Sequence, residues 1–231
     1  MKNDPFSVIS DSRIVSVLRR LHDKADKQMP GLLLNYLPQL PRILLGGKVR
    51  FTEHQMHNYY ADKYLALERN QAAFCYLTAR AIKAKTIVEF GSSFGISTIW
   101  LATAVCDNGG GKVIGTEIVS EKAEMANKNI AEAGLSDYVE MRTGDALETL
   151  KDGPKQIDLL LNDGFPALAL KIVELLTPRI IPGGIVLTDN VGTFKANYRD
   201  YVSYIRDSRN GFESMLLPFK SGTEYSIRKN G

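Results

Sequence analysis

The sequence predicts an α/β protein with a doubly wound, mostly parallel sheet, and two observations support this fold class. From Lys85 onward, short runs rich in β-branched and aliphatic residues alternate with longer runs of helical periodicity. Such alternation is typical of βαβ units, in which helices cover both faces of a parallel sheet. The length of 231 residues, 44% of them hydrophobic, suits one globular domain with a short N-terminal addition.

Five buried strands are predicted in chain order, each followed by a turn and a helix or by a loop. They are the runs TIVEF, KVIGTE, YVEMRTGD, IDLLLND and GIVLTDN. A helix near Tyr198 to Asp207 and the runs FESMLLPF and EYSIRK then predict an antiparallel strand pair at one edge of the sheet.

The N-terminal part of the chain has a different pattern. Apolar residues recur at helical spacing from Asp11 to about Lys27 and predict an amphipathic helix. An irregular connector is expected next because it contains Pro30, Pro38 and Pro41, and a long helix is then expected from Glu53 to Lys83. We therefore divide the chain into residues 1–52, an extra N-terminal segment serving as a cap or dimer contact, and a main domain of residues 53–231.

Composition indicates a cytoplasmic protein that binds neither nucleic acid nor membrane. The net charge is +3, and the 29 basic residues are spread along the chain. The first residues lack the pattern of a signal peptide, and no apolar run is long enough to span a bilayer. Cys75 and Cys106 each lie in an apolar stretch, which favours buried free thiols in a reducing compartment.

The first strand leads into the turn Glu89-Phe90-Gly91-Ser92-Ser93-Phe94-Gly95, which precedes a helix. Two glycines there allow a ligand to approach the backbone at a helix N-terminus. Ser93 and Ile96 occupy the second and third glycine positions of a G-x-G-x-x-G dinucleotide fingerprint. This departure argues against a nicotinamide-dependent oxidoreductase.

Acids end the next two strands. Glu117 follows Gly95 by 22 residues, where a carboxylate accepts hydrogen bonds from ribose hydroxyls; alternatively it faces water. The third strand ends in Gly144-Asp145-Ala146. Asp145 is placed to accept a hydrogen bond from an adenine amino group, to cap the next helix, or to do both.

Taken together, VEFGSSFGIST, Glu117, the triplet at 144–146 and VLTDN at 186–190 resemble class I S-adenosylmethionine (SAM) methyltransferases of the catechol and caffeoyl-coenzyme A O-methyltransferase type. The resemblance covers roughly residues 55 to 231 and implies a Rossmann-like methyltransferase sheet with SAM as cofactor. It places the cofactor among the residues Glu89, Gly91, Ser92, Ser97, Glu117, Gly144, Asp145, Ala146 and Asp163. Of these, Glu89, Gly91 and Ser97 would lie near the methionine part, Glu117 at the ribose and Asp145 near the adenine.

Three oxygen ligands for a metal are expected to converge where the methyl acceptor would bind. Asn162-Asp163 and Asp189-Asn190 end two strands that, if adjacent, are about 4.8 Å apart. The resemblance likewise implies that Asp163, Asp189 and Asn190 hold a divalent metal, which the hard oxygen ligands suggest is Mg²⁺. The alternative is that Asp189 and Asn190 form a turn and Asp163 caps the helix opening at Pro166.

The general base is left open. The related enzymes commonly carry a lysine three residues after the first metal aspartate, where this chain has Pro166. Lys171 is expected to face solvent, and His54 or His57 would serve only if the N-terminal helix folds over the pocket. The predicted activity is O-methylation of a small catechol-like (phenolic) acceptor by a homodimer, with Asp163 positioning metal and acceptor. The alternatives are an RNA-modifying methyltransferase and a cofactor-binding protein with weak or no catalysis.

Overall fold

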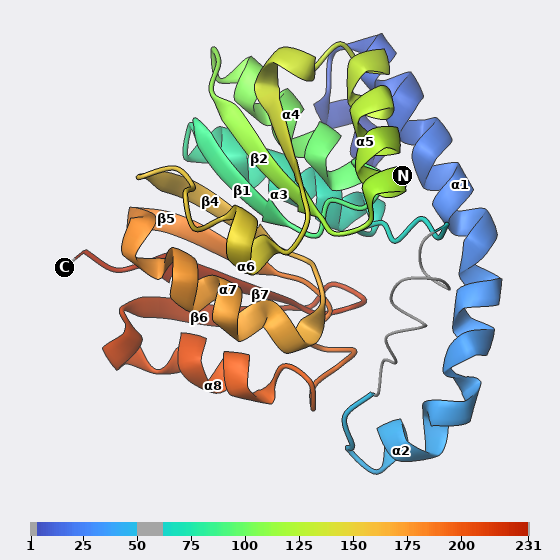
Figure 1. Cartoon of the computed structure of the whole chain (residues 1–231), viewed down its shortest axis with the longest axis vertical. Coiled ribbons are helices and arrows are strands. Elements are labelled where there is room, and N and C mark those ends of the chain that lie inside the picture. The colour runs from blue at the N-terminus through green and yellow to red at the C-terminus, as the bar shows by residue number, and fades with distance from the viewer. Residues whose placement is uncertain (1–3, 50–61, 231) are drawn as a thin grey trace.

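The computed structural model describes residues 4–49 and 62–230, and its centre is a seven-stranded sheet in the order β3-β2-β1-β4-β5-β7-β6 (Figure 1). The first five strands along the chain run parallel, and β7 pairs antiparallel with both β5 and β6. The doubly wound sheet with an antiparallel edge pair is therefore confirmed. The strands are β1 (Thr86–Phe90), β2 (Lys112–Glu117), β3 (Val139–Thr143), β4 (Ile157–Asn162), β5 (Ile180–Thr188), β6 (Phe212–Leu217) and β7 (Thr223–Arg228).

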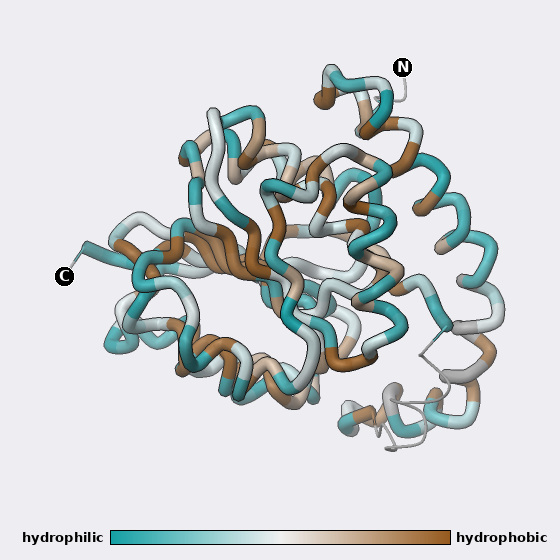
Figure 2. The backbone as a smooth tube through the Cα atoms, turned by 45° about the horizontal axis from the view of Figure 1, so that its top comes forward, coloured by the Kyte–Doolittle hydropathy of each residue, from teal (hydrophilic) through white to brown (hydrophobic). Residues whose placement is uncertain are grey.

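Helices cover both faces of the sheet because successive strand side chains point to opposite faces. In β1, Ile87 belongs to a core shared with α1, α3, α4 and α5, whereas Val88 belongs to a second core with α7 and α8. Figure 2 shows the hydrophobic colouring that this two-sided burial produces along the central strands. The covering helices are α3 (Arg69–Ala81), α4 (Ile96–Asp107), α5 (Ser120–Glu132), α6 (Ala146–Thr149), α7 (Ala169–Leu176) and α8 (Arg199–Arg206).

The first helix is longer than its sequence pattern suggested. The carboxylate of Asp11 caps α1 (Ser12–Tyr36) by accepting from the backbone N–H of Arg13 at 2.8 Å. The prediction that proline ends this helix near Lys27 is wrong, because α1 continues through Pro30. A proline inside a helix costs about 3 kcal/mol, and the helix nevertheless extends on both sides of Pro30. The proposed irregular connector is also largely helical, since a 3₁₀ turn (Leu37–Gln39) and α2 (Leu40–Leu44) follow.

The first half of α1 is anchored in the core of the main domain. His22 is buried against Trp100 of α4, and its Nε2 accepts a hydrogen bond from the indole N–H at 3.2 Å. Burial, and to a smaller extent the charge of Arg69, lowers the pKa of His22 to about 4. The role of residues 1–52 as a cap or a dimer contact stays a prediction. No helix in 4–49 or 62–230 has the length and apolarity that a membrane crossing requires.

Within residues 62–83, the helix predicted from Glu53 to Lys83 is present as α3, which begins at Arg69 and ends at Ala81. Residues 62–68 are not helical, because tertiary contacts replace the helical ones. The side chain of Gln28 accepts from the backbone N–H of Tyr64 at 2.7 Å and donates to the carbonyl oxygen of Asp62 at 3.3 Å. The Tyr64 ring stacks on Phe94 with centroids 4.0 Å apart. Residues 53–61, with His54 and His57, lie outside the described residues.

Candidate functional site

Polar side chains gather at the carboxyl ends of β1, β2, β4 and β5, around the point where the strand order reverses. This reversal lies between β1 and β4. Phe90 is in register with Asn162, and Asn162 with Thr188. Asp163 and Asp189, the next residue in each case, therefore leave the sheet at the same level. Open α/β sheets bind their ligands at this kind of switch point.

Gly91 brings the loop after β1 into contact with the loop after β4. Its φ is +95°, and an added Cβ would lie 2.6 Å from Gly164 Cα and 2.8 Å from the carbonyl oxygen of Asp163. The backbone N–H of Asp163 also donates to the carbonyl oxygen of Phe90 at 3.0 Å. Only glycine combines this backbone conformation with so close an approach. Gly95, with φ +83°, ends the loop at the start of α4.

Glu89 is fully buried beneath this loop. Its Oε2 accepts hydrogen bonds from the hydroxyls of Ser92, at 2.6 Å, and Thr98. Burial raises the pKa of Glu89, and the hydroxyls of Ser92, Ser97 and Thr98 oppose that rise. Its Oε1 has no hydrogen-bond partner among the described residues. A buried acceptor without a partner is costly, so Oε1 is available to a donor group of a ligand.

Glu117 does not face water, so that alternative is excluded. The residue is 9% exposed at the end of β2. Its Oε2 accepts from the backbone N–H of Ser93 at 2.8 Å, and its Oε1 from that of Val119 at 2.9 Å. These bonds fix the carboxylate beside the glycine loop. Each carboxylate oxygen has a further lone pair with which it can accept a ribose hydroxyl.

The third strand brings its predicted residues to the same edge. Gly144 has φ +124°, and its backbone N–H donates to the carbonyl oxygen of Glu117 at 2.9 Å. Asp145 caps α6, because its Oδ1 accepts from the backbone N–H of Leu147 at 2.9 Å. Ala146 is buried. The capping role of Asp145 is therefore observed, and its bond to adenine stays a prediction.

Asp163 and Asn190 meet across the ends of β4 and β5. Nδ2 of Asn190 lies 3.4 Å from Oδ1 of Asp163. Burial, followed by the charges of Asp189 and Glu89, raises the pKa of Asp163 well above its usual range.

The alternative role of Asp163, capping the helix that opens at Pro166, is wrong. The 3₁₀ turn Pro166–Leu168 has no side-chain cap. Asn190 does form a turn, with φ +64° and a carbonyl oxygen that accepts from two following N–H groups.

Asp189 is held by two side chains that the sequence pattern did not identify. It is 5% exposed, and its Oδ1 accepts from the Ser221 hydroxyl at 2.6 Å. Burial raises the pKa of Asp189, while hydrogen bonds from Ser221 and Gln71 oppose the rise. Gln71 lies in α3 and Ser221 between β6 and β7. Both are far from Asp189 in sequence, and no local motif marks either one.

The oxygen ligands at the ends of β4 and β5 fit a hard divalent cation. Two carboxylates and an amide oxygen are ligands that Mg²⁺ accepts, with water in its other positions. A cation between Asp163 and Asp189 would relieve their repulsion. The amide of Asn190 would need to turn so that its oxygen replaces Nδ2. The described residues contain no group of three or more His, Cys, Asp or Glu side chains arranged for a metal, so these three residues would have to suffice.

The structure does not identify a general base. Pro166 opens a 3₁₀ turn at the site, and it cannot accept a proton. Lys171 is exposed on α7, as expected from its sequence position. The remaining candidates, His54 and His57, lie outside the described residues.

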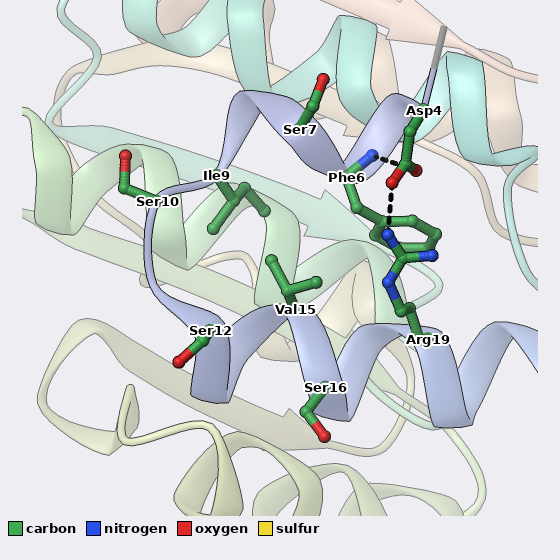
Figure 3. Close-up of a pocket in the computed structure, with 9 residues that line it drawn as sticks. All are labelled: Asp4, Phe6, Ser7, Ile9, Ser10, Ser12, Val15, Ser16 and Arg19. Carbon is green, nitrogen blue, oxygen red and sulfur yellow. Dashed lines mark hydrogen bonds and ion pairs between the residues drawn. The ribbon is translucent and has the colours of Figure 1, made fainter. Parts of the chain in front are cut away.

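An open hollow of about 480 Å³ lies elsewhere, between the N-terminal 3₁₀ turn (Pro5–Val8) and the start of α1 (Figure 3). Its lining includes Phe6, Ile9 and Val15, with the ion pair between Asp4 and Arg19 at its rim. None of the residues at the strand ends lines it. The hollow is therefore separate from the candidate site.

The sheet order, the glycine loop at the switch point and the acids at the strand ends define the Rossmann-like methyltransferase fold. Residues 88–191 match a family model described as a methyltransferase domain. The structure also matches the O-methyltransferase from Bacillus cereus in complex with SAH. The TM-score is 0.68, with 22% identity over 97% of this chain and 94% of that one.

Two curated relatives support the resemblance to O-methyltransferases. The chain is 33% identical over 131 residues to the catechol O-methyltransferase of Niastella koreensis. This aligned stretch covers 55% of this chain and 58% of that protein. It is 28% identical over 150 residues to caffeoyl-CoA O-methyltransferase 1 of Eucalyptus globulus, covering 60% of each. The predicted resemblance is therefore confirmed, and it spans a little over half the length of these relatives.

Proposed function

We propose that the chain is a SAM-dependent O-methyltransferase that acts on a hydroxyl of a small, catechol-like acceptor held by a divalent metal. The observation that carries the proposal is that Asp163 lies 3.4 Å from Asn190 and close enough to Asp189 and Glu89 for their charges to raise its pKa. On one side of the switch point, carboxylates can accept hydrogen bonds from a nucleoside and an amino acid. On the other side, oxygen atoms can bind a hard metal ion.

The residues at the ends of β1, β2 and β3 suit SAM in their hydrogen-bond acceptors and in their charge. Glu117, fixed by two backbone N–H groups, would accept from the ribose hydroxyls, and Asp145 would accept from the adenine amino group. The free Oε1 of Glu89 would accept from the amino group of the methionine part. Buried acids also favour a ligand with a positive sulfonium. The relatives' names and the SAH complex of the B. cereus enzyme support the same choice.

On the acceptor side, the hydroxyl oxygen attacks the methyl carbon as the carbon–sulfur bond breaks, giving a methyl ether, SAH and a proton. A phenol with a pKa of about 10 is ionised to only about one part in a thousand at pH 7. A divalent cation held by Asp163, Asp189 and Asn190 would supply a Lewis acid that lowers this pKa. The chain's own contribution is alignment, because the strand register fixes both aspartates relative to Gly91 and Glu89.

The test is methyl transfer from labelled SAM to catechol, measured with Mg²⁺ and with EDTA. We expect Mg²⁺-dependent transfer that Asp189→Ala abolishes, while calorimetry shows SAM affinity within a few fold of the wild type. Lys171→Ala is the matched control, since this exposed lysine lies outside the site and should change neither quantity.

Each failure points to a different conclusion. If SAM does not bind, the proposal is wrong. Binding without transfer to any phenolic acceptor would indicate a cofactor-binding protein, consistent with the loss of the usual lysine at Pro166. Transfer that persists in EDTA would contradict the proposed metal site. Transfer to RNA alone would show that the acceptor is RNA and not a small phenol.

A further inference from the structure

The loop between β6 and β7 brings Ser221 to the carboxyl end of β5, beside the candidate metal ligands. β7 pairs antiparallel with β5, and Thr188 lies opposite Glu224. The residues just before β7 therefore run past Asp189 and Asn190. The hydroxyl of Ser221 donates to Oδ1 of Asp189 at 2.6 Å, and Asp189 is 5% exposed. Such a short hydrogen bond to a buried carboxylate restricts the rotation of that side chain.

Backbone contacts hold Ser221 itself in place. The backbone N–H of Val191 donates to the carbonyl oxygen of Gly222 at 3.1 Å. The backbone N–H of Thr193 donates to the carbonyl oxygen of Ser221 at 3.0 Å. Gly222 has φ +74°, and an added Cβ would lie 2.6 Å from the backbone nitrogen of Gly192. The loop before β7 and the loop after β5 are thus joined closely, so the Ser221 hydroxyl has a fixed position relative to the end of β5.

Gln71 of α3 supports the same carboxylate. It is fully buried, its Nε2 donates to the hydroxyl of Thr223 at 2.8 Å, and its side chain also hydrogen bonds to Asp189. The Oε1 of Gln71 lies 3.4 Å from the Ser221 hydroxyl. A serine hydroxyl has one proton to donate, and the shorter distance of 2.6 Å assigns that proton to Asp189. Ser221 and Gln71 therefore act together on one side chain.

We propose that Ser221 is a positioning residue that makes this site select Mg²⁺ over Ca²⁺. The inference rests on the proposed function, since Asp189 has to be a ligand of the metal. Mg²⁺ demands a nearly ideal octahedral arrangement and keeps several of its waters, whereas Ca²⁺ takes more oxygen ligands in a flexible arrangement. A carboxylate held in one orientation, next to Asp163 and Asn190, suits the smaller ion.

Loss of the Ser221 hydroxyl would leave the Asp189 carboxylate freer to rotate. Binding of Mg²⁺ would then have to order this carboxylate again, and removal of a group that orients a metal ligand typically lowers metal affinity about 10–100-fold. Ca²⁺ should lose less affinity, because it accepts a wider range of carboxylate orientations. The ratio of the two affinities therefore reports positioning, whereas a general loss of structure would lower both affinities alike.

Calorimetric titration of the full chain with MgCl₂ and, separately, with CaCl₂ tests the proposal without any methyl transfer. We expect the wild type to bind Mg²⁺ more tightly than Ca²⁺. Ser221→Ala should lower the Mg²⁺ affinity at least about tenfold and the Ca²⁺ affinity about threefold or less. Ser221→Thr, which keeps the hydroxyl, should retain the affinity and the preference of the wild type.

Ser214→Ala is the matched control. The Ser214 hydroxyl also donates to a buried carboxylate at 2.6 Å, that of Glu224, but it lies on β6 outside the candidate site. This variant should bind both ions as the wild type does.

The possible failures are distinguishable. A wild type that binds neither ion would contradict the metal in the proposed function, and this inference with it. If the wild type prefers Mg²⁺ but Ser221→Ala keeps that affinity and preference, only the role of Ser221 is wrong. Equal losses of Mg²⁺ and Ca²⁺ affinity in Ser221→Ala would also overturn the inference, and so would a wild type that binds Ca²⁺ as tightly as Mg²⁺.

Discussion

Replacing Gly91 by alanine tests how the two loops of the candidate site are held together. At φ +95° a residue with a side chain pays about 1–2 kcal/mol in backbone strain. The new methyl would also lie 2.6 Å from Gly164 Cα and 2.8 Å from the carbonyl oxygen of Asp163. Both neighbours are backbone atoms, so no side chain can rotate away. Overpacking of this kind costs about 1–3 kcal/mol, and we expect a total loss of about 2–5 kcal/mol in the free energy of unfolding.

Gly110→Ala is the control that separates strain from collision. Gly110 has a similar φ of +103°, but no atom lies within 4 Å of its added Cβ. It should lose only about 1–2 kcal/mol. Urea unfolding followed by the fluorescence of the single, fully buried Trp100 measures both variants.

The same variants should differ in SAM binding. Gly91→Ala must push the loop that carries Asp163 away from the loop that carries Ser92, so we expect SAM affinity to fall at least tenfold by calorimetry. Gly110→Ala should bind SAM as the wild type does. Equal losses of stability in the two variants, or unchanged SAM affinity in Gly91→Ala, would refute the argument that this contact shapes the site.

Three further predictions concern the core, the segment before α3 and the acids at the strand ends. The folded-state pKa of His22 is lowered to about 4, so stability is complete above pH 6.5 and should fall by up to about 3 kcal/mol as the pH drops towards 4. Unfolding curves of His22→Gln should lack this decline, and parallel curves would contradict it. Tyr64→Ala should weaken SAM binding by up to about tenfold through loss of the stack on Phe94, while calorimetry should show Tyr64→Phe near wild type. Mg²⁺ should raise the melting temperature of the wild type but not of Asp189→Asn; an equal rise would argue against a metal at Asp189.

The sequence predicted the sheet and the main acids of the site for the same reason. Parallel strands are short apolar runs, and each ends where a polar residue begins, so the strand ends could be located from the pattern alone. Glu117, Asp163 and Asp189 were assigned from those ends, and Glu89 from the resemblance to methyltransferases; all four lie at the same edge of the sheet. The structure adds the register of β4 and β5, which pairs Asn162 with Thr188 and so aligns Asp163 with Asp189.

Features that depend on tertiary contacts could not be predicted in this way. Gln71 and Ser221 bond to Asp189 from segments that only the fold brings together. The segment around Tyr64 has helix-compatible residues, yet Gln28 of α1 satisfies its backbone and holds it out of a helix. Pro30 was given too much weight, because one lost hydrogen bond does not end a long helix.

The distribution of unsatisfied polar atoms supports a ligand at the switch point. Among the described residues, four buried side-chain atoms have no hydrogen-bond partner: Glu89 Oε1, Ser93 Oγ, Thr149 Oγ1 and Asn162 Oδ1. Three of these four belong to residues at the carboxyl ends of β1 and β4. Native proteins leave few such atoms, because each one costs about 1–3 kcal/mol. Together with the raised pKa values of Glu89, Asp163 and Asp189, this concentration means that the edge is destabilised when empty and would be stabilised by a cationic ligand rich in hydrogen-bond donors.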